Sequence, residues 1–227
     1  MTKTGYLKRH RFPILIIRTA VILHMLLPSR IVSMILYLLL RANVTHKTIC
    51  EWTNKFASNI NLPQYNCTAE ILICHVDEKY VKVNGEWCYW WSLKDMLGNV
   101  IHAIVTKLRD FASAKKLLVE AREKIGRKVN ILVRDGLPAY DKSTKFLGRK
   151  CKSVIAGING KGFIYKKNFY WLTNNPAESL NSEIDFYLGK FQNNFENIES
   201  ANKFARIFML LKHLKKKFME KKLLEAS

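Results

Sequence analysis

Residues 74–87 read CHVDEKYVKVNGEW, and this stretch determines the fold that the sequence predicts. The apolar run Ile71–Val76 predicts a buried strand. Asn84-Gly85, set between two strand-like segments, is a strong signal for a two-residue hairpin turn. Asp77 directly follows the apolar run, so a carboxylate is expected at the end of a buried strand, where desolvation is costly without a partner. The acid is either simply solvated there or part of a site.

The segments that follow the hairpin predict a mixed α/β sheet. Val100–Thr106 reads as a third strand, which completes an antiparallel meander. Asp110 is placed to cap a helix that Gly126 ends. The remaining expected elements are a strand at 129–133, a helix at 138–147, short strands and loops at 148–173, a helix from 176 to about 188, and a basic amphipathic helix at 198–224. This order predicts a mixed sheet with flanking helices.

The N-terminal part of the chain predicts a small all-α region. Helices are expected at 13–25, 29–40 and 46–57, and Thr45 is placed to cap the third. Two helices joined by a tight turn in a region poor in acids favour a helix-turn-helix. The polar segment 59–69 has no periodicity and reads as a linker. The predicted organisation is 1–58 helix-turn-helix region, 59–69 linker, 70–195 catalytic core and 196–227 basic C-terminal helix.

The charge balance points to a polyanionic partner. The chain has 38 Lys and Arg against 18 Asp and Glu, a net charge of +20, and no acidic residue precedes Glu51. Such a field attracts polyanions, of which nucleic acid is the commonest, and this interpretation is favoured over the alternative of a merely soluble basic protein. The candidate DNA-binding residues are Lys8, Arg9, Arg11, His46, Lys47, Lys79 and Lys82.

Two other classes of protein are disfavoured by the sequence. The five cysteines show no spacing suited to zinc, which favours a reduced, intracellular chain. The apolar stretches 14–27 and 31–40 raise the alternative of a membrane hairpin, but the first contains Arg18 and the second is too short to span alone. We therefore expect a cytoplasmic protein with no membrane segment.

A second acid repeats the pattern of the first. The apolar strand expected at 129–133 leads into Arg134-Asp135-Gly136, and side chains at strand ends line the crevice where α/β proteins place ligands. Carboxylates that meet at one sheet edge, with no set of His and Cys ligands nearby, favour magnesium or manganese. Two-metal phosphoryl transfer needs about three such carboxylates. The helix after Asn174-Asn175-Pro176 offers Glu178 in its first turn, or Glu183.

Three segments then resemble a known family. They are VDEKYVKVNGEWCYWW at 76–91, RDGLPAY at 134–140 and LTNNPAESLNSEI at 172–184. They look like the three catalytic blocks of DDE insertion-sequence transposases, in particular of the insertion-sequence-six family in its archaeal branch. HRFP at 10–13 and VTHKTICEW at 44–52 resemble the helix-turn-helix region of the same family.

The resemblance implies a fold, a site and an activity. The fold is an RNase H-like, retroviral-integrase-type core. Asp77, Asp135 and Glu178 would be the catalytic triad that binds two Mg²⁺ or Mn²⁺ ions, with Glu183 the alternative third ligand. The activity is cutting double-stranded DNA at terminal inverted repeats and joining the 3′-hydroxyl to target DNA, by a homodimer or larger assembly at the nucleoid of a prokaryote. The alternative is a DNA-binding regulator or a domesticated, inactive transposase.

Overall fold

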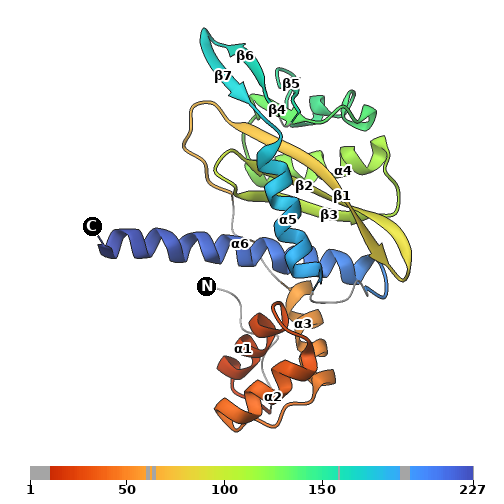
Figure 1. Ribbon diagram of the computed structural model, residues 1–227, viewed down its shortest axis with the longest axis vertical. Coiled ribbons are helices and arrows are strands. Elements are labelled where there is room, and N and C mark those ends of the chain that lie inside the picture. The colour runs from red at the N-terminus through yellow and green to blue at the C-terminus, as the bar shows by residue number, and fades with distance from the viewer. Residues whose placement is uncertain (1–10, 60–61, 63–64, 158, 190–194, 227) are drawn as a thin grey trace.

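A mixed sheet forms the centre of the protein. The computed structural model describes residues 11–59, 62, 65–157, 159–189 and 195–226 (Figure 1). The five strands lie in the order β3-β2-β1-β4-β5; the first three are antiparallel, and β4 runs parallel to both β1 and β5. The strands are β1 Ile73–Val83, β2 Glu86–Asp95, β3 Val100–Thr106, β4 Ile131–Arg134 and β5 Lys152–Ile155.

Helices cover both faces of this sheet. On one face lies α4 (Phe111–Ile125), where Leu117 and Leu118 pack with Trp91. On the other face lie α5 (Asn175–Gly189) and α6 (Ile198–Ala226), and α5 crosses the sheet beside β1 (Figure 1). The predicted fold class, a mixed α/β sheet with flanking helices that follows an N-terminal helical region, is therefore confirmed.

Local signals in the sequence set several of the boundaries. Asn84 and Gly85 both have positive φ, 49° and 79°, as a two-residue turn between β1 and β2 requires. The side chain of Asp110 accepts a hydrogen bond from the backbone N–H of Ser113 at 2.8 Å and so caps α4. Gly126 ends that helix with φ 66°. These three predictions are confirmed.

The prediction that Asp77 follows the end of a strand is wrong. β1 continues from Ile73 to Val83, and within it Asp77 pairs with Ser92 of β2. The polar residues at 77–79 remain in the strand because the antiparallel ladder with β2 satisfies their backbone groups. It is the parallel neighbour β4 that ends nearby, at Arg134. Asp77 thus lies where the neighbouring strand stops.

The predicted helix at 138–147 is also not formed. Two short 3₁₀ helices, Pro138–Tyr140 and Thr144–Leu147, occupy the segment. Asp141 lies between the two 3₁₀ helices and forms an ion pair with Arg134 at 2.5 Å. Tyr140 is fully buried. These tertiary contacts override the helical propensity of the segment.

The N-terminal region is a three-helix bundle. It consists of α1 Ile14–His24, α2 Ser29–Leu40 and α3 His46–Ser58. Ile17, Val32 and Trp52 belong to its own apolar core, and the Thr45 hydroxyl caps α3 by accepting from the Thr48 N–H at 3.3 Å. No helix within the described ranges is long and apolar enough to cross a membrane.

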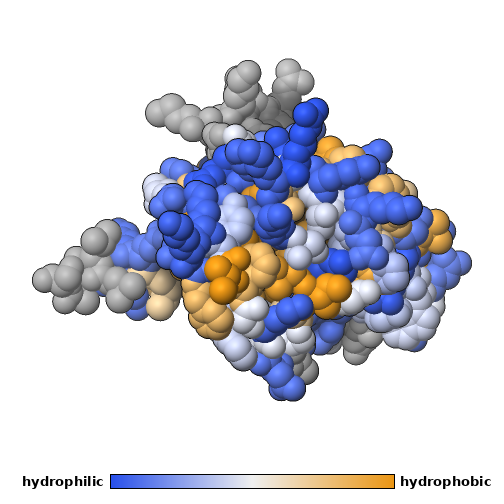
Figure 2. All heavy atoms as spheres, turned by 90° about the horizontal axis from the view of Figure 1, so that it is seen from above, coloured by the Kyte–Doolittle hydropathy of each residue, from blue (hydrophilic) through white to orange (hydrophobic). Residues whose placement is uncertain are grey.

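A separate hairpin lies between the second and third acids of the predicted triad. β6 (Lys161–Tyr165) and β7 (Asn168–Leu172) form their own two-stranded sheet at the top of the molecule (Figure 1). Seen from above, the surface is mostly hydrophilic, with a smaller apolar area near its middle (Figure 2). The hairpin lies between Asp135 and Glu178 in the sequence.

Candidate active site

Asp77 and Asp135 come together because their strands are parallel and adjacent. Ile73 pairs with Ile131 and His75 with Val133, so continuing the same register by two residues places Asp77 level with Asp135. Within the described part of the chain, ligand oxygens of Asp77, Glu78 and Asp135 lie within 4.8 Å of one another. The sequence prediction that the two aspartates converge agrees with this geometry.

The loop after β4 fixes the position of Asp135. One carboxylate oxygen, Oδ1, accepts from the backbone N–H of Leu137 at 2.9 Å. Arg134 is buried, and its guanidinium donates to Ser153 Oγ at 2.8 Å and to the carbonyl oxygen of Asp135 at 2.9 Å. The second oxygen, Oδ2, lies 4.0 Å from an Arg109 nitrogen.

The carboxylate of Asp77 is buried between two donors. Oδ1 accepts from the backbone N–H of Glu78 at 3.0 Å, and Oδ2 accepts from the side-chain amide of Asn181 at 2.8 Å. Burial raises the pKa of Asp77 to about 7, and the negative charge of Glu78 adds to this effect, although both hydrogen bonds oppose it. The cluster therefore carries more negative charge than its surroundings stabilise, and a cation would relieve it.

Glu78 is also part of the cluster, which no pattern in the sequence predicts. Its side chain is 2% exposed and binds Arg109, with Nε 2.7 Å from Oε1, while the Tyr140 hydroxyl donates to Oε2 at 2.6 Å. Tyr140 in turn packs edge-on against Trp91. The sequence does show an acid, Glu78, beside Asp77 and a cation, Arg109, beside the Asp110 cap. Their contact depends on the tertiary structure, so neither residue alone predicts the pair.

One face of α5 is aligned with β1. Asn181 binds Asp77, and one turn later Asp185 forms an ion pair with Lys79 at 2.7 Å. Glu178 lies one turn before Asn181, so it is on the same face of the helix. It is exposed and is not among the carboxylates that converge within 4.8 Å in the described residues. Glu183 instead forms an ion pair with Lys212 at 2.6 Å.

The candidate DNA-binding residues are spread over the molecule. Arg11 and Lys47 are exposed on the N-terminal bundle, where His46 is half-buried. On β1, Lys79 is held by Asp185, and Lys82 is exposed with its ammonium over the ring of Trp87. Of this set, Lys79 lies closest in sequence to the acid cluster. Two further candidates, Lys8 and Arg9, are outside the described residues.

The family comparison identifies the class of protein to which this pair of acids on adjacent strands belongs. The model of the DDE domain family of IS240-type transposases matches residues 72–218, which is more than half of the chain. The chain belongs to this family of DDE domains, which use divalent metal ions. A comparison with curated protein sequences finds no significant match.

Two solved structures are similar at low sequence identity. One is the intasome of simian T-cell lymphotropic virus in complex with PP2A regulatory subunit B56 gamma, at 14% identity and a TM-score of 0.43, covering 78% of this chain and 66% of that one. The other is endonuclease V from Bacillus subtilis, at 15% identity and a TM-score of 0.23, covering 79% of this chain and 95% of that one. The assignment depends on the family match.

Proposed function

We propose that the protein is a transposase of the insertion-sequence-six type that cuts double-stranded DNA at terminal inverted repeats and joins the freed 3′-hydroxyl to target DNA. The observation that carries this proposal is the meeting of Asp77 and Asp135 where β4 ends beside β1, next to the face of α5 that bears Glu178. Family membership supports it. Because two DNA ends must be held together, we propose a homodimer or larger assembly, acting in the cytoplasm at the nucleoid.

The donor set fits divalent metal ions. Carboxylate oxygens are hard ligands suited to Mg²⁺ or Mn²⁺, and burial of Asp77 among other acids favours a bound cation. We assign Asp77, Asp135 and Glu178 as the residues that hold two ions. When bound, the ions supply activation of the attacking oxygen and stabilisation of the leaving oxygen of the phosphodiester.

Glu178 is favoured over Glu183 as the third ligand. Asn181 contacts Asp77, and a residue three positions earlier in a helix shares its face, whereas one two positions later points elsewhere. Glu183 is moreover neutralised by Lys212. Glu178 is not committed to another cation among the described residues, so its side chain is available to turn toward the aspartates.

Glu78 serves a different role in this proposal. Since both of its oxygens bind Arg109 or Tyr140, it is a positioning residue that holds the Arg109 guanidinium near Asp135. Arg109 keeps one terminal nitrogen free of these contacts, and its side chain is 34% exposed. It can therefore donate to an oxygen of the phosphodiester bound at the cluster.

The test of this function is a cleavage assay with purified protein and labelled duplex DNA that carries the element's own terminal repeat. Nicking is expected with Mg²⁺ or Mn²⁺ and none with EDTA, and affinity is expected to fall steeply with salt because phosphate contacts release counterions. Tight binding without nicking under either metal would overturn the enzyme and favour a DNA-binding regulator or domesticated copy.

Asn181 offers a separate prediction. Asn181→Ala removes the amide that orients the Asp77 carboxylate, so affinity for Mn²⁺ is expected to weaken about tenfold or more. Isothermal titration calorimetry on the full chain measures this. The matched control is Ser182→Ala, an exposed neighbour on the same helix, which should bind Mn²⁺ as the wild type does. Equal weakening in both variants would contradict the orienting role.

A further inference from the structure

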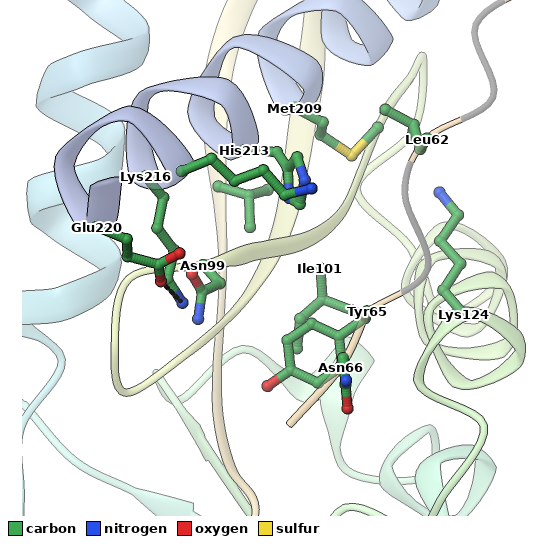
Figure 3. A pocket seen from close by; sticks show the side chains of 12 residues that line it. Leu62, Tyr65, Asn66, Asn99, Ile101, Lys124, Met209, His213, Lys216 and Glu220 are labelled. Atoms are coloured by element: carbon green, nitrogen blue, oxygen red, sulfur yellow. Dashed lines mark ion pairs between the residues drawn. The ribbon is translucent and has the colours of Figure 1, made fainter. Parts of the chain in front are cut away.

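A hollow away from the acid cluster is lined by cations. It has a volume of about 220 Å³ and lies between α6, the turn from β2 to β3, the end of α4 and the segment around Tyr65 (Figure 3). The basic side chains that line it are Lys124, His213, Lys216 and Lys217, and the one carboxylate that the described residues add to the lining is that of Glu220. The lining therefore has a positive excess that complements an anion.

The charges of this hollow are poorly neutralised. Lys216 forms a long ion pair with Glu220, 3.6 Å, and no carboxylate in the described residues pairs with Lys217. The Lys124 ammonium contacts a ring nitrogen of His102 at 2.7 Å instead of a carboxylate. Burial lowers the pKa of Lys124 to about 8, and the negative charge of Glu120 opposes this effect only in part.

One polar atom at the hollow lacks a partner. His213 is directed into it (Figure 3), and its Nε2 is buried without a hydrogen-bond partner in the described part of the chain. Buried polar atoms are almost always hydrogen-bonded, so an orphan beside unneutralised lysines points to a ligand that supplies an acceptor. Burial and the charges of Lys217 and Lys216 lower the pKa of His213.

The walls of the hollow are held in place by a buried acid. Asp95 is 3% exposed and accepts from the Tyr65 hydroxyl at 2.8 Å and from the Asn99 backbone N–H at 2.8 Å. It thereby ties the segment before β1 to the turn between β2 and β3. The site is built before any ligand arrives, which lowers the entropic cost of binding.

We propose that this hollow binds a backbone phosphate of double-stranded DNA, with Lys124, Lys216 and Lys217 as charge contacts and with His213 Nε2 as a hydrogen-bond donor once the imidazole turns to expose this atom. The inference rests on the proposed function, since it assumes that DNA is the substrate. A second hollow of about 360 Å³ shares Asn99, His213 and Lys216 and is lined in addition by Lys215 and by Lys212, which is paired with Glu183. Across the two hollows, Lys215, Lys216 and Lys217 place consecutive cations on α6, as contacts to neighbouring phosphates would require.

The test measures binding in EDTA, so that it is independent of cleavage. Fluorescence anisotropy with a labelled duplex is compared for the wild type, for Lys216→Gln/Lys217→Gln, and for a matched control, Lys115→Gln/Lys116→Gln, which removes the same charge from exposed positions on α4 outside the hollow. The first double variant is expected to bind about tenfold more weakly, with the salt dependence of log affinity reduced by about 0.9 for each phosphate that it no longer neutralises. The control should keep the wild-type slope.

Each other outcome overturns the inference. Equal weakening of DNA affinity in both double variants would mean that affinity depends only on the net charge of the protein and not on this hollow. Unchanged binding by Lys216→Gln/Lys217→Gln, while the wild type still cleaves DNA with Mg²⁺, would leave the proposed function intact and remove this site. Calorimetry with inorganic phosphate forms a further arm: phosphate that binds the hollow and is not displaced by duplex would indicate a small phosphorylated ligand instead of DNA. Circular dichroism melting checks that the variants are folded.

Discussion

Asp135→Asn is expected to lower the rate of metal-dependent DNA cleavage by at least about a thousandfold. This exceeds the tenfold to hundredfold cost typical of residues that only orient a metal ligand, because the substitution removes a ligand charge itself. The shape of the side chain is nearly unchanged, and the Asn oxygen can still accept from the Leu137 N–H. The loop after β4 should therefore keep its conformation.

DNA binding and stability provide the readouts that separate catalysis from folding. Asp135 adds to the repulsion that raises the pKa of Asp77, so its neutralisation should leave the melting temperature equal or higher. Affinity for duplex DNA in EDTA should stay within about twofold, since the variant removes no cation. Loss of binding together with cleavage would count against the assignment of Asp135 as a metal ligand.

The third ligand is tested by a pair of variants on one helix. Glu178→Gln is expected to abolish cleavage as Asp135→Asn does, whereas Glu183→Gln should retain most of it, because Glu183 is already paired with Lys212. The two substitutions change the same charge within two turns of α5, so general electrostatic effects are matched. The reverse result would transfer the role to Glu183.

Arg109→Ala is expected to lower the free energy of unfolding by about 3 kcal/mol. Its removal leaves the carboxylate of Glu78, whose side chain is 2% exposed, buried without its cation, and an uncompensated buried charge is strongly destabilising. The double variant Arg109→Ala/Glu78→Gln should recover much of the loss, since neutral Gln can still accept from the Tyr140 hydroxyl. Urea unfolding, with midpoints and slopes compared, measures this cycle.

A surface ion pair serves as the control for this cycle. Lys107 and Glu86 lie 3.6 Å apart with both side chains largely exposed. Lys107→Ala should therefore change the free energy of unfolding by less than about 0.5 kcal/mol. An equally small effect of Arg109→Ala would show that the contacts among Glu78, Arg109 and Tyr140 contribute little to stability. It would also contradict the role of Glu78 in positioning Arg109 at the acid cluster.

Features encoded by neighbouring residues could be read from the sequence. The Asn84-Gly85 turn, the Asp110 cap and the Gly126 helix end each depend on the conformational preference of one or two residues. The meander and the strand before Asp135 followed from apolar runs, and these brought two aspartates to adjacent strands. The candidate site was predictable to that extent.

Features that depend on partners distant in the chain could not be read from it. A charged triplet at 77–79 looks like a strand end, but it stays in β1 because β2 supplies the opposing backbone groups. The commitment of Glu78 to Arg109 and Tyr140, and of Lys79 to Asp185, depends on contacts across 31 or more positions of sequence. Contacts between residues this far apart in the chain leave no local pattern in the sequence.

The long helix α6 belongs to more than one part of the molecule. Its first half carries Phe204 and Phe208, which share one apolar cluster with Met25 and Ala57 of the N-terminal bundle and with Leu180 of α5. The bundle is thus a structural support of the sheet as well as a neighbour of it. A gene fragment that encoded only the residues after 58 would yield a chain with an incomplete core, so loss of the 5′ end of the gene would impair the acid site without altering any of its residues.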